Sequence, residues 1–231
     1  MKFPELVPAT FIKRNNRFTA GVRLESGKVS TAFVPTTGRL TGVLNPGCQV
    51  WMAPAEIGSG RKTPYSLVLV ALERDGLCCV NAINANRLFD EAACSSRLKA
   101  FQYRHIQNEV SFGNSRLDFK LTEDDQVCWV EVKSVTYAAD GIGMFPDAPT
   151  ARGAKHLLEL SKLTTSGYRA SVVFIAQRED VQCFMSYKEV DLNFTQTLRQ
   201  VHAQGVEIHS YNCAVSVGSI VIKDEIPFII P

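Results

Sequence analysis

The chain lacks the long apolar run that a membrane span requires. Its longest hydrophobic stretches, at residues 66–72 and 170–176, are far shorter than the roughly 20 residues that cross a bilayer. Residues 1–5 lack the apolar core of a signal peptide. No segment is of low complexity, and charged residues make up 21% of the chain, which does not indicate disorder. We therefore expect a soluble cytoplasmic protein without a membrane partner.

Cysteine and histidine spacings typical of zinc sites are also missing. The chain has seven cysteines, an odd number, and no Cys-x-x-Cys pair. Most of them lie in apolar runs, as Cys78, Cys79 and Cys128 do. This pattern indicates buried, reduced thiols in an intracellular protein.

What the sequence does contain is enough apolar material for a core and an uneven distribution of charge. The 231 residues are 45% hydrophobic, which suits one large or two small domains. Residues 1–80 carry ten Lys and Arg against five Asp and Glu, whereas the remainder carries fifteen against eighteen. A basic first third suggests a polyanion-binding module joined to a metal-binding one, although such an excess is also common on solvated surfaces.

The first 80 residues have the pattern of a small barrel. Strands at 17–24 and 28–34 flank the turn Glu25-Ser26-Gly27 and predict a hairpin. Further strands are expected at 49–53, 65–72 and 77–80, with Gly and Pro between them. Five short strands in about 70 residues predict an OB-like barrel over residues 1–80. The candidate inward positions of the hairpin are Val22, Leu24, Val29 and Phe33.

Residues 81–231 have a different pattern, in which helices and strands alternate. Apolar residues at helical spacing predict helices at about 81–100, from Thr150 to about 166, and from Asp191 to about 205. Strands are expected at 109–112, 115–121, 127–136, 169–177 and 206–211. The order α-β-β-β-α-β-α-β predicts a second domain with a mixed sheet and helices on its faces.

A cluster of carboxylates and a lysine on two of these strands has the composition of a metal site. Two-residue periodicity puts Glu131 and Lys133 on one face, about 7 Å apart. Asp118 lies on the preceding strand, and a hairpin through the acidic turn at 123–125 would bring it alongside Glu131. Carboxylates, with the backbone carbonyl of Val132 as a third ligand, suit Mg²⁺ or Mn²⁺, and a lysine can orient water or stabilise developing charge. The alternative is a surface Asp beside an ordinary Glu–Lys ion pair.

Several segments resemble the sugar fermentation stimulation protein (SfsA) family over nearly the whole chain. The most specific is Glu131-Val-Lys-Ser-Val-Thr136. The others are Phe145-Pro-Asp-Ala148, Thr150-Ala-Arg-Gly-Ala-Lys-His156, Ser115-Arg-Leu-Asp-Phe119, Ala85-Asn-Arg-Leu88, and Pro35-Thr-Thr-Gly38 with Thr41-Gly42. One departure is visible, because the family's usual Pro-Asn-Thr-Gly has Thr36 in place of Asn, and Arg39 follows where the family has a small residue.

The resemblance implies an N-terminal OB-like domain and a restriction-endonuclease-like αβ sandwich of the PD-(D/E)xK class, with an α-β-β-β-α-β core. By that resemblance Asp118, Glu131 and Lys133 take the signature roles in metal binding and catalysis. The family's proteins have been regarded as non-specific DNA binders and regulators of sugar metabolism, whereas the PD-(D/E)xK signature implies nuclease chemistry.

Secondary site residues are less sharply defined. Glu91 on the first helix and Glu109 before the first strand compete as an additional carboxylate, and either can equally be an exposed acid. Arg152 and His156, four apart on the second helix, can contact phosphate near its N-terminus or belong to an ordinary capped helix. The remaining candidates for nucleic-acid binding are Arg14, Arg17, Arg39, Arg61, Lys62 and Tyr65 on the barrel and Arg87 on the first helix. Aromatic residues of the barrel can stack on bases, as in other nucleic-acid-binding barrels, or they can be ordinary core residues.

The sequence therefore favours a DNA-binding protein with a Mg²⁺- or Mn²⁺-dependent nuclease site. RNA is an alternative substrate, and a homodimer would suit the cutting of both strands, although no segment identifies an interface. The first alternative function is a non-catalytic DNA-binding protein or transcriptional regulator. The second is an enzyme acting on a small phosphorylated metabolite, which the basic first third fits poorly.

Overall fold

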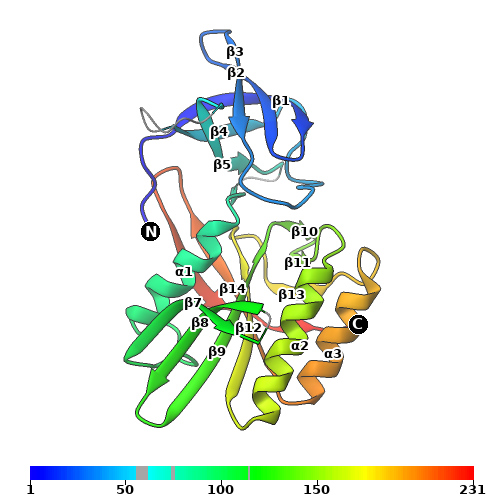
Figure 1. The fold of residues 1–231 in the computed structure, drawn as a ribbon. Coiled ribbons are helices and arrows are strands. Elements are labelled where there is room, and N and C mark those ends of the chain that lie inside the picture. Colours follow the sequence, from blue (N-terminus) through cyan, green and yellow to red (C-terminus); the bar gives the residue numbers. More distant parts are fainter. Residues whose placement is uncertain (56–61, 74–75, 114) are drawn as a thin grey trace.

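The computed structural model describes residues 1–55, 62–73, 76–113 and 115–231. Its N-terminal part is a closed barrel, at the top of Figure 1, built from β1 (Val7–Asn16), β2 (Thr19–Leu24), β3 (Val29–Phe33), β4 (Gln49–Pro54) and β5 (Tyr65–Ala71). The sheet order is β3-β2-β1-β4-β5-β6, with β6 spanning Leu77–Cys79. An additional parallel pairing of β3 with β5 closes the ring. The predicted OB-like barrel is confirmed.

The barrel interior is filled by small and branched apolar side chains. Val22 is fully buried, as the alternating pattern predicts, and Leu24 and Phe33 are half-buried. Val29 is 61% exposed, so its predicted inward position is wrong. It is the first residue of β3 and pairs with the exposed Arg23 beside the hairpin turn, where the strands extend past the core.

The second part of the chain is a mixed sheet with helices on both faces. Its elements are α1 (Ile83–Cys94), β7 (His105–Phe112), β8 (Ser115–Glu123), β9 (Gln126–Val135), α2 (Ala151–Thr165), β12 (Arg169–Ala176), α3 (Leu192–Ala203), β14 (Glu207–Val215) and β15 (Ile220–Glu225). The sheet order is β15-β14-β12-β9-β8-β7, and β9, β12 and β14 run parallel. The mixed αβ sandwich is confirmed.

A smaller sheet was not predicted from the sequence. It consists of β10 (Tyr137–Ala139), β11 (Ile142–Phe145), β13 (Cys183–Ser186) and β16 (Phe228–Ile229), in the order β10-β11-β13-β16. Strands of two to four residues are too short to show a periodicity, which explains why the sequence pattern did not reveal them. β15 was also missed.

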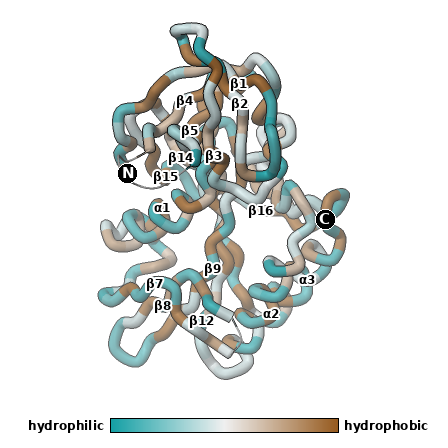
Figure 2. The backbone as a smooth tube through the Cα atoms, turned by 45° about the horizontal axis from the view of Figure 1, so that its top comes forward, coloured by the Kyte–Doolittle hydropathy of each residue, from teal (hydrophilic) through white to brown (hydrophobic). Residues whose placement is uncertain are grey.

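The main sheet separates two hydrophobic cores. One lies under α1 and includes Phe89, Val130 and Val132, and the other lies under α2 and α3 and includes Leu157 and Phe194. Figure 1 shows α1 on one side of the sheet and α2 and α3 on the other. In Figure 2 the tube of β9, which runs between these layers, is largely hydrophobic. Polar side chains on β9 are therefore conspicuous.

The N-terminal ends of α2 and α3, which lie on the same face of the sheet, are linked by a hydrogen bond. Thr150 caps α2, since its Oγ1 accepts a hydrogen bond from the Gly153 amide at 3.0 Å. Asp191 caps α3 by accepting from the Phe194 amide at 2.9 Å, and its other oxygen accepts from the Thr150 amide at 2.8 Å. These caps fix the beginning of α2 relative to the sheet. Among the described residues, no helix is long and apolar enough to cross a membrane.

Candidate active site

The candidate site lies where β8 and β9 stop pairing. The two strands are joined by the two-residue turn Asp124-Asp125, and their ladder ends at the pair Phe119 and Val130. Beyond this pair, β8 continues back to Ser115 and β9 continues to Val135 without a shared ladder. Leu117 and Phe119, two residues apart, belong to different cores, so β8 rotates about Asp118. The opening between the strands begins at Asp118 and Glu131.

Asp118 is fixed by two hydrogen bonds, one to each carboxylate oxygen. Its Oδ2 accepts from the Val132 amide at 2.8 Å. Its Oδ1 accepts from Nδ2 of Asn86, on α1, also at 2.8 Å. Each oxygen keeps a lone pair for a further partner. Sequence reasoning missed Asn86, although it lies inside the segment Ala85-Asn-Arg-Leu88 that carries the family resemblance.

Glu131 is a buried carboxylate whose two oxygens have different surroundings. Its side chain is 3% exposed, and its Oε1 contacts both Nζ of Lys133 and Nδ1 of His156. Its Oε2 is buried without a hydrogen-bond partner. A buried carboxylate oxygen without a partner is costly unless a ligand completes it.

The two carboxylates of the cluster differ in how their charge is compensated. Burial raises the pKa of Asp118, and the negative charge of Glu131 raises it further. Burial would also raise the pKa of Glu131, but the charge of Lys133 and the hydrogen bond from His156 outweigh it, so that pKa is lowered. Asp118 thus lies beside an ionised neighbour, an arrangement that a cation would stabilise.

The donor set fits a hard divalent cation. Asp118 and Glu131 supply carboxylate oxygens, the ligands that such cations prefer. The N–H and C=O of one strand residue point to the same side, and the Val132 amide points to Asp118, so its carbonyl faces the same opening. Within the described ranges no group of three His, Cys, Asp or Glu side chains forms a metal cluster, so a third protein ligand would be an uncharged oxygen such as the Val132 carbonyl. The roles of Asp118, Glu131 and Val132 as metal ligands stay predictions.

The second helix adds a histidine and an arginine to this cluster. His156 is 6% exposed, and its ring lies against Glu131 rather than on the surface where a phosphate could contact it. Arg152 is exposed, and its Nε donates to Nε2 of His156 at 3.4 Å. The structure therefore brings Arg152, His156, Glu131 and Lys133 into one chain of contacts.

The two additional carboxylates from the sequence prediction lie outside these contacts. Glu91 binds the N-terminal amine of Met1 at 2.8 Å. Glu109 faces Arg116 at 3.5 Å, with both side chains at least 60% exposed. Among the described residues, neither Glu91 nor Glu109 makes a hydrogen bond or ion pair with the groups of the candidate site. The side chains that contact Asp118 and Glu131 are those of Asn86, Lys133 and His156.

The basic residues of the barrel are not all available to a ligand. Arg14 is half-buried, and its guanidinium donates to the carbonyls of Gly38 and Arg39 at 2.9 Å and to that of Arg17, so it organises a loop. Arg17 and Arg39 are exposed, and Arg17 lies over the exposed ring of Phe18 at 5.6 Å. Of the other candidates, Lys62 and Arg87 are exposed, Tyr65 is half-buried, and Arg61 lies outside the described residues.

An acidic residue between β11 and α2 joins the barrel to the second domain. Oδ2 of Asp147 accepts from the Leu40 amide at 3.0 Å. A Cβ on Gly38 would lie 2.5 Å from the same oxygen, so only glycine fits this approach. Thr36 accepts from the Gly38 amide at 3.1 Å, which is the turn that an asparagine would also form. The departure at Thr36 therefore preserves the loop that carries Arg39.

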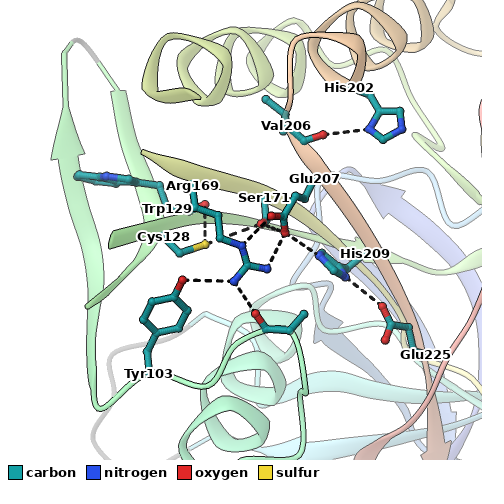
Figure 3. Close-up of polar contacts among 11 residues, drawn as sticks. Tyr103, Cys128, Trp129, Arg169, Ser171, His202, Val206, Glu207, His209 and Glu225 are labelled. Carbon is teal, nitrogen blue, oxygen red and sulfur yellow. Dashed lines mark hydrogen bonds and ion pairs between the residues drawn. The ribbon is translucent and has the colours of Figure 1, made fainter. Parts of the chain in front are cut away.

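A second polar cluster lies on the opposite face of the sheet (Figure 3). Arg169 makes a bidentate pair with Glu207, at 2.7 and 2.6 Å, and also donates to the Ala100 carbonyl at 2.6 Å. His209 lies between two carboxylates, Glu207 at 3.1 Å and Glu225 at 3.0 Å. The members of this cluster are paired with one another.

Comparison with known proteins agrees with both domains. Residues 12–80 match the model of the SfsA N-terminal OB domain, and residues 83–219 match that of the sugar fermentation stimulation protein RE domain. A sugar fermentation stimulation protein homolog of Moorella thermoacetica is 45% identical over 91% of this chain and 90% of its own length. One from Pseudoalteromonas translucida is 37% identical over 99% of this chain and 100% of its own.

A solved structure extends the likeness to three dimensions. The structure of Pyrococcus furiosus SfsA in complex with Ca²⁺ superposes with a TM-score of 0.91 at 29% identity, covering 100% of this chain and 98% of that one. Both domains and their order are therefore shared over the full length. The chain belongs to the sugar fermentation stimulation protein (SfsA) family.

Proposed function

We propose that this protein is a metal-dependent nuclease whose barrel holds the nucleic acid. The observation that carries the proposal is the buried, partnerless Oε2 of Glu131 beside Asp118, whose pKa is raised. A purely structural ion pair would leave no such oxygen and would not need a second carboxylate next to it. The related Pyrococcus furiosus protein was solved with Ca²⁺, a cation of the same ligand preference.

Each residue of the cluster has a task in phosphodiester hydrolysis. Asp118, Glu131 and the Val132 carbonyl would hold Mg²⁺ or Mn²⁺. When bound, such a cation supplies Lewis-acid stabilisation and lowers the pKa of a coordinated water. Lys133, with its side chain 13% exposed, is placed to orient the attacking water and to stabilise charge on the phosphoryl oxygens. Arg152 is exposed and can hold a neighbouring phosphate.

The barrel would provide most of the affinity. Arg17, Arg39 and Lys62 are exposed cations, and Phe18 offers a ring that is 44% exposed, on which a base can stack. Asp147 fixes the Arg39 loop to the start of α2, so nucleic acid bound there lies on a surface continuous with the site. We propose DNA as the partner, with RNA as the alternative. A homodimer stays a prediction.

One observation favours a second function, a DNA-binding regulator that does not use the site. Lys133 contacts Glu131 directly, and an ion pair of this kind can keep a carboxylate buried without metal. Asp118 argues against it, because a regulator gains nothing from a second carboxylate that repels both Glu131 and phosphate. Measured cleavage and metal binding separate the two functions.

The test uses the purified full-length protein with single-stranded, duplex and branched DNA and with RNA. We expect cleavage with Mg²⁺ or Mn²⁺ that is lost in E131Q and K133M, while DNA binding persists in both. The matched control is E207Q, which removes a carboxylate charge from the opposite face of the sheet. The proposal fails if no substrate is cut with either metal, or if E131Q cuts as well as the wild type. Binding that is sensitive to salt but indifferent to metal would then establish the regulator.

A further inference from the structure

His156 occupies a position on α2 that neither a surface role nor a core role explains. It is buried at 6% exposure, yet both of its ring nitrogens have polar partners. Nδ1 contacts Oε1 of Glu131, and Nε2 accepts a hydrogen bond from Nε of Arg152 at 3.4 Å. Both partners are charged side chains, one on β9 and one on α2 itself.

The direction of these hydrogen bonds follows from the chemistry of arginine. A guanidinium has donors and no acceptor, so Nε2 of His156 must be the acceptor of the bond from Arg152. The ring proton then sits on Nδ1 and is donated to Glu131. The carboxylate of Glu131 and the guanidinium of Arg152 thus favour the same tautomer, in which His156 donates to the carboxylate.

The two carboxylate oxygens of Glu131 differ in their contacts. Lys133 and His156 both contact Oε1, whereas Oε2 is buried and has no partner. Lys133 has a flexible stem and can leave Oε1 to meet water or phosphate, but the His156 ring is held on a helix packed against the sheet. The histidine is the permanent donor that fixes the rotation of the carboxylate.

We propose that His156, oriented by Arg152, is a positioning residue that holds Oε1 of Glu131 and thereby presents Oε2 to the divalent cation. This inference rests on the proposed metal site and adds to it the device that orients its buried ligand. Residues that orient metal ligands typically change metal affinity by about 10–100-fold when they are replaced. Its geometry makes His156 a partner of the ligand rather than a ligand itself.

The experiment compares His156 variants in the full chain by Mn²⁺ binding, measured by calorimetry without nucleic acid. H156N keeps an N–H group in place of Nδ1, whereas H156L fills similar space without a donor. We expect H156N to bind Mn²⁺ within a few-fold of the wild type and H156L to bind about tenfold or more weakly. R152M should lie between them, and R97M, which removes an exposed arginine from beyond the end of α1, should have no effect. Nitrogen NMR of the metal-free protein should show the Nδ1–H tautomer of His156 in the wild type, because Nδ1 faces the carboxylate of Glu131, which accepts a hydrogen bond and cannot donate one.

The outcomes separate this inference from the proposed function. If the wild type binds Mn²⁺ and H156L, checked as folded by thermal melting, binds it equally well, the positioning role is overturned while the metal site stands. An Nε2–H tautomer in the wild type would also overturn it. If the wild type binds no Mn²⁺, the metal site itself fails. Rescue by H156N together with loss in H156L supports the inference, since packing alone would favour leucine over asparagine.

Discussion

The two faces of the main sheet carry two clusters of charged residues with opposite characters. On the α1 face, Arg169, Glu207, His209 and Glu225 alternate in charge, and the carboxylate of Glu207 accepts from both cations (Figure 3). The other cluster, named here the α2-face cluster, consists of Glu131 with its partners Lys133 and His156, and of the neighbouring Asp118 at the opening between β8 and β9. One cluster has two cations in direct contact with its two carboxylates when His209 is protonated, whereas Lys133 is the cation of the other cluster that contacts Glu131 directly.

A structural ion-pair network differs from a candidate binding site in how fully its buried carboxylates are compensated. In the complete network, burial alone would raise the pKa of Glu207, but His209 and Arg169 outweigh it and lower that pKa to about 2. At the α2 face the corresponding forces leave the pKa of Asp118 raised and Oε2 of Glu131 without a partner. The arrangement does not stabilise the fold, which is the reason for our proposal that it binds a cation.

The largest expected effect is on cleavage. D118N removes one ligand charge and its repulsion of Glu131, so we expect cleavage to fall by about 100-fold or more. The melting temperature should stay equal or rise, because the raised pKa of Asp118 shows that its charge is unfavourable in the folded state. The opposite-face variant E207Q should keep its cleavage rate. The contrast between the faces disappears if D118N cleaves at the wild-type rate or if E207Q loses activity.

Divalent cations should stabilise one face only. At a concentration of 100 Kd, a cation that binds only the folded state adds about 2.7 kcal/mol. For a chain of this size that corresponds to roughly 5–11 °C in melting temperature. We expect this rise for the wild type with Ca²⁺ or Mn²⁺ and its absence in E131Q, as measured by differential scanning calorimetry. A similar rise in E131Q would show that the cation binds elsewhere.

The paired network should show the reverse behaviour. R169M removes the bidentate bond to Glu207 and the bond to the Ala100 carbonyl, and leaves Glu207 partly buried without its main partner. Since the pair is about one-third exposed, we expect a loss of roughly 2 kcal/mol in the free energy of unfolding, below the cost of breaking a fully buried pair. Denaturant unfolding measures it, and cleavage by the folded variant should be unchanged. A loss of metal binding in R169M would mean that the two faces are coupled.

Much of the α2-face site could be predicted from the sequence because it rests on local geometry. Glu131 and Lys133 are two apart on a strand, and the acidic turn at Asp124 brings Asp118 back beside them through a hairpin. Periodicity and short loops determine both relations. The proposed metal ligands are therefore brought together without information from distant elements.

The remaining contacts depend on how distant elements pack, which no local pattern encodes. Asn86 reaches Asp118 only because α1 packs against β9, next to β8, and His156 reaches Glu131 only because α2 packs on the other face. The network of Arg169 with Glu207 joins parallel strands 38 residues apart. Likewise Val29 alternates correctly but lies beyond the barrel core, so periodicity assigned it the wrong environment.

The smallest expected effect is the pH dependence of stability, which comes from the paired network. Burial alone would lower the pKa of His209, but its bonds to Glu207 and Glu225 outweigh it and raise that pKa. A raised histidine pKa contributes stability that is fully present below the unfolded value of about 6.5 and is lost as the pH rises through the folded value. The lowered pKa of Glu207 contributes stability above about 4.5 that is lost as the pH falls toward about 2.

The metal-free protein should therefore be most stable between about pH 4.5 and 6.5, as far as this network decides. Its melting temperature, measured in a chelating buffer, should fall by a few degrees from pH 6 to 8.5. H209Q cannot carry the charge, so its profile should be flatter over that range and should meet the wild-type profile at high pH. H202Q is the matched control, because His202 contacts only the Val206 carbonyl among the polar groups described here. If the melting temperature of H209Q depends on pH as steeply as that of the wild type, the titration belongs to other groups. The contrast between a pH-sensitive network on the α1 face and a metal site on the α2 face would then be wrong.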